Sequence, residues 1–111
     1  MNPFEFLKKA LSPKPIEALP RNAILIDVRS HAEFAGGSIP GAIHIPLNQI
    51  HLIASHQSQI DPSNPIIVFC ASGMRSGLAR RQLLSMGYVN AINGGGVASL
   101  AAQLSLEKNR A

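Results

Sequence analysis

Short apolar runs alternate along the chain with stretches in which apolar side chains recur every three or four positions. The short runs predict buried β-strands over 23–28, 42–45, 66–69 and 89–93. The longer stretches predict helices over 3–11, 76–86 and 97–106, with two shorter helices that open at Ser30 and at Leu47. Because strands and helices alternate, we expect an α/β fold in which a parallel sheet carries helices on both faces.

Two of the predicted strands end in residues that can take part in chemistry. Cys70 directly follows the run 66–69, and Asp27 lies near the end of the run 23–28. In parallel sheets of this kind, ligands bind beyond the carboxyl ends of the strands. We therefore expect the functional site at this edge of the sheet.

Length and composition indicate one soluble domain. Its 111 residues divide into an N-terminal helix and proline-containing link over 1–22, part of the same domain, a core over 23–106 and a C-terminal tail over 107–111. A hydrophobic content of 46% excludes intrinsic disorder, and a mean hydropathy of +0.15 without a long apolar run excludes a membrane protein. No apolar stretch typical of a secretory signal follows Lys8 and Lys9, so we expect the protein in the cytoplasm.

Charge and cysteine content narrow the function classes further. The net charge of +4 is spread thinly, and with one tyrosine, four phenylalanines and no tryptophan few side chains can stack on bases. This composition disfavours nucleic acid as a partner and favours small anions. The single cysteine, Cys70, excludes a disulfide within the chain, and it excludes a cysteine-only zinc site unless another chain supplies ligands.

The segment from Cys70 to Ser76 joins a predicted buried strand to the start of a helix. Gly73 permits the positive φ that a sharp turn needs, and a curled loop can aim several backbone N–H groups at one point. The N-terminus of the following helix also favours an anion there, and Arg75 adds a positive charge. We therefore expect the Cys70 thiol to ionise below the ordinary value of about 8.5 and to act as a nucleophile without a histidine base.

Simpler interpretations of these residues stay open at this point. A lone cysteine at a strand end is commonly a small buried apolar side chain. Arg75 could lie on the surface, and Ser76 is more often a helix cap than a contact of bound sulfur. The combination of a nucleophile, a glycine, an arginine and a helix start in one short segment favours catalysis.

Two separated motifs resemble the rhodanese family of sulfurtransferases. The first runs through Leu25-Ile26-Asp27-Val28-Arg29-Ser30 and Glu33-Phe34 to Ile39-Pro40-Gly41-Ala42-Ile43-His44-Ile45-Pro46-Leu47. The second joins 70–76 to Gly87-Tyr88 and Asn93-Gly94-Gly95. The resemblance covers residues 23–100 in the correct order, which a single short motif would not give. It implies a three-layer fold whose central, mostly parallel sheet has five strands and helices on both faces.

By this resemblance, Cys70 carries the transferred sulfur. The anion-binding loop that follows it consists of Ala71, Ser72, Gly73, Met74, Arg75 and Ser76. The implied reaction moves sulfane sulfur from thiosulfate, a small anion, or from a persulfide donor, through a Cys70 persulfide, to cyanide or a thiol acceptor. A sulfur-relay protein fits as a partner, and we expect no cofactor.

The resemblance also bears on residues outside the loop. In the family, the residues that match Asp27 and Arg29 support the fold around the site, and Asp27 within an apolar strand requires a hydrogen-bonding or ionic partner. Ser38 stands where the family usually has a histidine, and Leu100 replaces an aromatic residue after the late glycines. These departures leave the reaction intact but leave the substrate preference and the pocket wall open.

Three other functions fit parts of the pattern. A non-catalytic carrier module would accept persulfide from a partner and relay it. A cysteine-dependent phosphatase is less favoured, because four residues separate Cys70 from Arg75, one fewer than in phosphatase loops, and Asp61 is better interpreted as a turn former than as an acid. A disulfide or arsenate reductase is disfavoured because the chain has no second, resolving cysteine.

The remaining polar motifs predict no further site. The histidines lack the spacing of metal ligands, so we expect no metal at His31, His44, His51 and His56. The run Gly94-Gly95-Gly96 lacks the Lys and the Ser or Thr of a phosphate-binding loop, and we interpret it as a tight turn between a strand and a helix.

Overall fold

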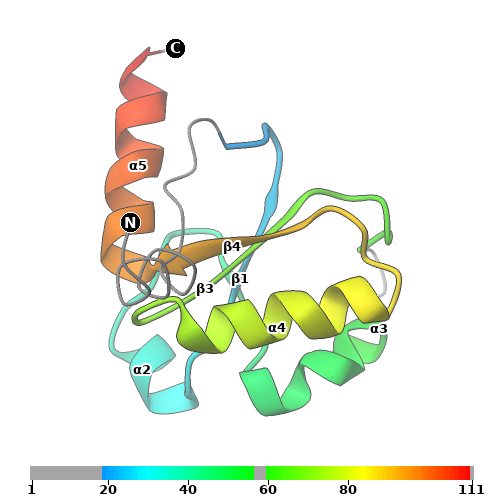
Figure 1. Ribbon diagram of the computed structural model, residues 1–111. Helices are drawn as coiled ribbons and strands as arrows, with labels where there is room; N and C mark the ends of the chain where they lie inside the picture. Colours follow the sequence, from blue (N-terminus) through cyan, green and yellow to red (C-terminus); the bar gives the residue numbers. More distant parts are fainter. Residues whose placement is uncertain (1–18, 57–59, 111) are drawn as a thin grey trace, which may run out of the picture.

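Four parallel strands of the described residues form one sheet in the middle of the molecule (Figure 1). A computed structural model of the chain describes residues 19–56 and 60–110, and the predicted helix over 3–11 lies outside them. The strands are β1 (Ile24–Asp27), β2 (Ile43–His44), β3 (Ile66–Cys70) and β4 (Ala91–Gly96), in the order β2-β1-β3-β4. Each short apolar run of the sequence therefore forms one strand of a parallel sheet.

The expectation of five strands is wrong for the described part of the chain. The number five came from the family resemblance, whereas the hydrophobic pattern contains four short apolar runs. A strand buried between two layers needs apolar side chains on both faces. The described segments 29–41, 46–56 and 60–65 are interrupted by glycine, proline or polar residues, and none of them forms a further strand of this kind.

Helices cover both faces of the sheet, as the alternating pattern predicted. They are α2 (His31–Ala35), the 3-10 helix η1 (Leu47–Leu52), α3 (Ile53–His56), α4 (Met74–Ser85) and α5 (Val97–Arg110). Helices α4, η1 and α3 lie on one side of the sheet, and α5 lies on the other (Figure 1). The three-layer α/β architecture is therefore confirmed. Among the described helices, none has the length and apolar character needed to cross a membrane.

The central strand β3 is buried on both faces. Successive side chains of a strand point to opposite sides, so β3 contributes to two hydrophobic clusters. Ile66, Val68 and Cys70 belong to the cluster under α4, and Ile67 and Phe69 belong to the cluster under α5. Cys70 therefore stands at the end of a fully buried strand, which fixes its position.

Strand β4 differs from the predicted strand 89–93 at both ends. Val89 is 65% exposed and precedes the strand, which begins at Ala91 opposite Ile66. At its other end the strand continues through 94–96. The three glycines are therefore part of the strand, and their interpretation as a tight turn is wrong.

Close packing explains why glycines occupy the end of β4. A Cβ atom at Gly94 would lie 2.6 Å from Ile67 Cγ2, and one at Gly96 would lie 2.5 Å from the carbonyl oxygen of Ala71. Both distances are too short for any side chain, so the glycines let β4 approach β3 and the segment after Cys70.

Helix α5 is longer than predicted. It runs past Leu106 to Arg110, through most of the segment expected to be a tail. The backbone N–H of Leu19 donates to the carboxylate of Glu107 over 3.1 Å, and the Leu19 side chain is buried in the cluster under α5. The end of the proline-containing link therefore packs against the same domain.

Candidate active site

The backbone after Cys70 curls around its sulfur atom. Cys70 is buried, and the exposed Ala71 and Ser72 turn the chain before Gly73 opens α4 with a φ of 98°. The N–H of Gly73 donates to Cys70 Sγ over 3.0 Å, and the N–H of Ser76 donates to it over 3.4 Å. The Oγ of Ser76 lies 3.3 Å from the same sulfur. The loop amides point inward, as the sequence predicted.

These contacts favour the negatively charged form of the thiol. Burial raises the pKa of Cys70, but the Ser76 hydroxyl and the backbone N–H groups of Ser76, Ser72 and Gly73 lower it by more. The pKa of the thiol therefore lies below its ordinary value. The N-terminus of the 12-residue helix α4 begins at the loop and adds its positive dipole end. The thiolate is the form of cysteine that acts as a nucleophile.

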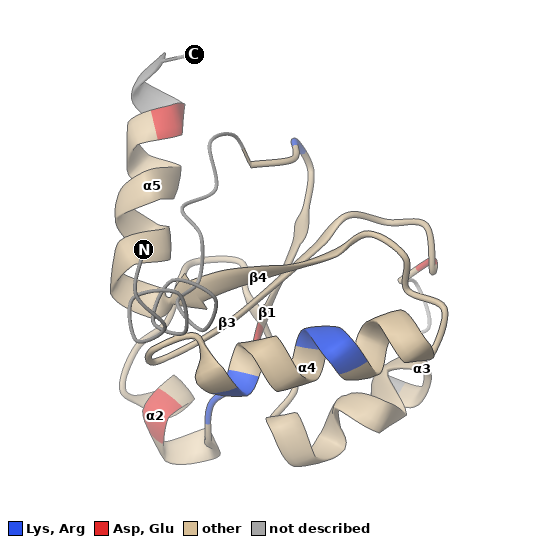
Figure 2. Ribbon diagram, viewed as in Figure 1, with Lys and Arg blue, Asp and Glu red and all other residues tan. Residues whose placement is uncertain are grey.

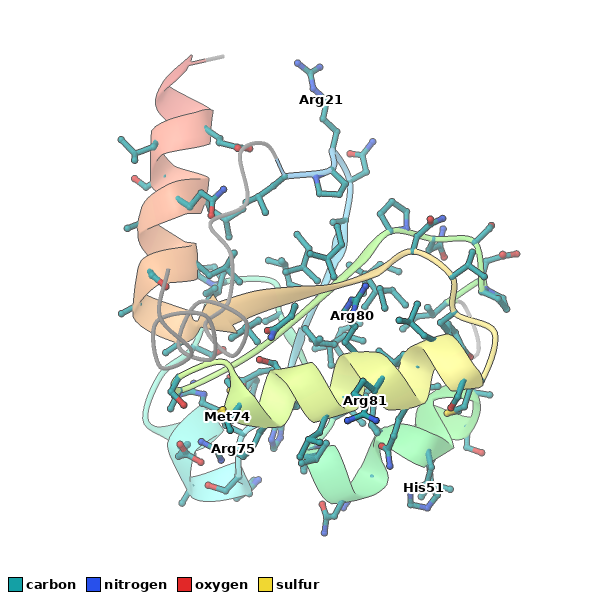
Figure 3. The ribbon with its side chains drawn as sticks, in the orientation of Figure 1. Arg21, His51, Met74, Arg75, Arg80 and Arg81 are labelled. Carbon is teal, nitrogen blue, oxygen red and sulfur yellow. The ribbon has the colours of Figure 1, made fainter. Side chains whose placement is uncertain are left out.

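The guanidinium group of Arg75 is bound by a carboxylate. Its Nη1 and Nη2 donate to Oε1 and Oε2 of Glu33 over 2.7 and 3.0 Å. The first turn of α4 is basic and faces the acidic position of α2 (Figure 2), and Figure 3 shows Met74 and Arg75 at this end of α4. The predicted charge of Arg75 is present, but Glu33 compensates it. Neutral donors therefore carry most of the stabilisation of the thiolate.

Sequence reasoning missed the part that Glu33 plays at the site. The predicted helix start at Ser30 is confirmed, and Ser30 and Glu33 form a capping box there: the Ser30 Oγ accepts the Glu33 N–H and the Glu33 carboxylate accepts the Ser30 N–H. The same carboxylate also binds Arg75, and these hydrogen bonds hold the pKa of Glu33 well below its ordinary value. Glu33 therefore joins the start of α2 to the cysteine loop. A capping box in sequence gives no sign of this second, long-range contact.

Asn93 is a second residue to which sequence reasoning gave no role. Its Oδ1 accepts the Ser76 hydroxyl over 2.7 Å and the Gly95 N–H over 2.9 Å. Its Nδ2 donates to the carbonyl oxygen of Gly73 over 3.0 Å. One side chain of β4 therefore holds both ends of the amide-donating segment. The available signal was a polar residue in the middle of a strand that is otherwise apolar or glycine.

A family model described as the rhodanese-like domain matches residues 7–102 of the chain. The chain belongs to the rhodanese-like family. The resemblance drawn from the two motifs is thereby confirmed, and the match contains the whole segment 70–76.

Sulfurtransferases are among the relatives of this rhodanese-like chain. It is 36% identical over 72 residues to a sulfurtransferase of Allochromatium vinosum, covering 65% of this chain and 64% of that protein. It is 35% identical over 77 residues to the thiosulfate sulfurtransferase PspE of Escherichia coli, covering 68% and 72% of the two chains. A solved structure described as rhodanese with anions from E. coli has a TM-score of 0.63 and 34% identity, covering 68% and 88%. The chain thus spans less than two thirds of the Allochromatium protein.

Asp27 and Arg29 form a buried ion pair at the end of β1. Arg29 Nη2 lies 2.8 Å from Asp27 Oδ2, and the Nε and backbone N–H of Arg29 also donate to the carboxylate. Burial raises the pKa of Asp27, but these hydrogen bonds lower it by more. Arg29 Nη2 also donates to the carbonyl oxygen of Gly37 over 2.7 Å. The expected partner of Asp27 is therefore Arg29, and the pair ties β1 to the turn after α2.

The two departures from the family pattern have structural explanations. The Ser38 hydroxyl donates to Asp27 Oδ2 over 2.7 Å, so Ser38 belongs to the buried ion-pair network. Leu100 is buried in the cluster under α5, close to the backbone of Gly94. Leu100 is therefore part of the hydrophobic core.

The histidines of the described segments have other partners or lie on the surface. His44 Nε2 lies 2.8 Å from the carbonyl oxygen of Arg29, and its ring stacks on Phe34 with centroids 4.4 Å apart. His31 and His51 are exposed, and the side chain of His56 lies outside the described part. Within residues 19–56 and 60–110, no three His, Cys, Asp or Glu side chains come together as metal ligands would.

Proposed function

We propose that this rhodanese-like protein is a sulfurtransferase in which Cys70 carries the sulfur. The Cys70 thiolate attacks the outer sulfur of thiosulfate, a new S–S bond forms, and the old one breaks with its electron pair leaving on sulfite. A persulfide donor reacts in the same way and releases a thiol. Cyanide or a thiol acceptor then attacks the outer sulfur of the Cys70 persulfide and restores the Cys70 thiolate.

One observation carries this proposal. The Cys70 Sγ lies within hydrogen-bonding distance of two backbone N–H groups and one hydroxyl, all from the seven residues that begin at Cys70. Donors fixed in place before reaction stabilise a negative sulfur without reorganisation. They favour both the attacking thiolate and the negative outer sulfur of a persulfide. A sulfur-carrying role for Cys70 also agrees with the relatives that are named as sulfurtransferases.

Intact mass spectrometry tests the sulfur-carrying step. After incubation with thiosulfate, the full chain should gain the mass of one sulfur atom and should lose it again on treatment with cyanide. Cys70→Ser should gain no mass, because the chain has no other cysteine. An unmodified mass after incubation with both thiosulfate and an organic persulfide would contradict the proposal.

Turnover measurements separate an enzyme from a carrier. We expect repeated formation of thiocyanate from thiosulfate and cyanide with ping-pong kinetics, because the two half-reactions share the Cys70 persulfide. Loading from a persulfidated protein without turnover of thiosulfate would instead identify a relay module. Cys70→Ser serves as the inactive control in both assays.

We place this activity in the cytoplasm. A thiol that must accept sulfur has to remain reduced between cycles, and the cytoplasm keeps thiols reduced. Cell fractionation with an antibody against the chain tests this location, and recovery in a membrane or secreted fraction would contradict it.

A further inference from the structure

The side-chain amide of Asn93 has a fixed orientation behind the cysteine loop. Its Nδ2 donates to the Gly73 carbonyl oxygen over 3.0 Å, and its Oδ1 accepts the Gly95 N–H over 2.9 Å. A carbonyl oxygen can only accept and an N–H can only donate, so turning the amide over would lose both bonds. Asn93 Oδ1 therefore faces Ser76 whatever the charge on Cys70.

Ser76 has one hydroxyl hydrogen for two neighbours. Its Oγ lies 2.7 Å from Asn93 Oδ1 and 3.3 Å from Cys70 Sγ. Asn93 Oδ1 can only accept, so the shorter contact requires the Ser76 hydrogen to point at Asn93. The S–H of a neutral Cys70 then donates to Ser76 Oγ, and the three side chains form one chain of hydrogen bonds.

Ionisation of Cys70 changes which acceptor the Ser76 hydroxyl hydrogen binds. The thiol proton passes to solvent, and the sulfur that remains can only accept. The Ser76 hydrogen must then turn from Asn93 Oδ1 to Cys70 Sγ. Asn93 Oδ1 keeps its bond from the Gly95 N–H, so the change leaves no buried acceptor without a donor.

We propose that Asn93 is a positioning residue that sets the acidity of Cys70 by competing with the thiolate for the single hydroxyl hydrogen of Ser76. Because of this competition, Cys70 is a weaker acid than it would be if the Ser76 hydrogen were free to bind the thiolate. The bond from Asn93 to Gly73 meanwhile keeps the loop in place. The inference rests on the proposed function, because the acidity of Cys70 matters to transfer only if its thiolate is the nucleophile.

Substitutions at positions 76 and 93 leave the charged groups around Cys70 unchanged. Arg75 on α4 is paired with Glu33 on α2, and Arg29 is paired with Asp27 on β1. Strand β4 itself contributes no charged side chain. The effects of these pairs on the thiol therefore cancel when variants at positions 76 and 93 are compared.

A double-mutant cycle tests the competition. The ultraviolet absorbance of the thiolate is followed against pH in the full chain, in Asn93→Ala, in Ser76→Ala and in the double variant, each corrected with the matching Cys70→Ser protein. Asn93→Ala should lower the titration midpoint. At a pH below the midpoint, the fraction of Cys70 present as thiolate should rise about threefold, as expected for one hydrogen bond. Ser76→Ala should raise the midpoint, and in that background Asn93→Ala should no longer lower it.

Two results would overturn the inference. One is a midpoint that rises in Asn93→Ala, and the other is a midpoint that falls equally with and without Ser76. Asn90→Ala is the matched control, because Asn90 Nδ2 donates to the Ser63 carbonyl oxygen over 2.7 Å and lies just before β4. Its midpoint should equal that of the unaltered chain.

Nuclear magnetic resonance gives a second test that needs no change at Asn93. In the unaltered chain, the side-chain amide signals of Asn93 should shift along the thiol titration, and in Ser76→Ala they should not. Asn93 signals that stay still in the unaltered chain would overturn the inference. Sulfur loading measured by intact mass tests the proposed function separately, because loading can succeed in a chain that shows no coupling between Asn93 and Ser76.

Discussion

Two arginine–carboxylate pairs lie near the site, and they differ in burial. The side chains of Arg29 and Asp27 are 9% and 0% exposed, whereas those of Arg75 and Glu33 are 38% and 34% exposed. The first pair joins residues two positions apart, and the second joins α4 to α2 across 42 positions. The two pairs share one chemistry in two different environments.

Burial decides what each pair contributes. A buried charge must keep its partner, because an unpaired one in the interior costs several kcal/mol. Solvent screens a partly exposed pair, so such a pair adds little to stability. Its two parallel hydrogen bonds still fix the relative orientation of the groups that it joins. We infer that Asp27–Arg29 maintains the fold and that Arg75–Glu33 positions the cysteine loop.

The largest expected effect comes from a change that leaves both pairs intact. Cys70→Ser removes the only thiol of the chain and should abolish turnover of thiosulfate and cyanide completely, while thermal unfolding changes little. Thiocyanate formation measures the first effect, and circular dichroism measures the second. Residual turnover in this variant would show that neither pair serves a cysteine-based site.

Removal of the buried pair's cation should give the largest loss of stability. Arg29→Met leaves the Asp27 carboxylate buried with its Ser38 bond but without its cation, and should lower the free energy of unfolding by about 3–5 kcal/mol. Urea denaturation measures this loss. Arg21→Met, at an exposed arginine, is the matched control and should be close to neutral. Equal stabilities of the two variants would remove the distinction between the pairs.

Loss of the partly exposed pair, Arg75–Glu33, should lower turnover more than stability. Arg75→Met frees the loop from α2 and should lower turnover about tenfold through misplacement of the amides, with little change in unfolding temperature. Glu33→Gln should act in the same direction. Arg81→Met, at an exposed position of the same helix, should keep full turnover. A destabilisation of Arg75→Met as large as that of Arg29→Met would contradict the assignment of roles.

The smallest expected effects are the gradual changes of turnover and stability with pH. The pKa values of Asp27 and Glu33 are lowered in the folded chain, so their stabilisation is present above their unfolded values of about 4 and is lost as pH falls through the folded ones. Because the ordinary pKa of a cysteine, about 8.5, lies well above that of a carboxylate, about 4, we expect Cys70 to protonate at higher pH than Asp27 or Glu33. As pH falls from 7, turnover should therefore decline while circular dichroism shows an intact fold. Simultaneous loss of turnover and fold would contradict this order.

The fold was largely predictable because it depends on local patterns. The apolar runs predicted the strands and Ser30 marked the start of α2, whereas α4 begins at Met74, before the predicted start at Ser76. The glycines of β4 were misinterpreted, because a glycine that permits close approach looks in sequence like a glycine that permits a turn. The close approach to Ile67 and Ala71 is a tertiary property.

The site was predictable where its residues are contiguous. The segment 70–76 contains the sulfur and its amide donors, so one motif indicated them together. Glu33 and Asn93 reach the loop from other elements, 42 positions from Arg75 and 17 positions from Ser76. Contacts at such separation follow from the packing of α2 and β4 and have no local signature.

The titration of Cys70 in the folded chain, compared with the same chain unfolded in guanidinium chloride, tests the central claim most directly. The chain has one cysteine, so its thiolate absorbance, corrected with Cys70→Ser, reports on this atom alone. The account predicts a lower midpoint in the folded chain, because the loop amides and Ser76 bind the thiolate more strongly than burial opposes it. A folded midpoint equal to or above the unfolded one would contradict it.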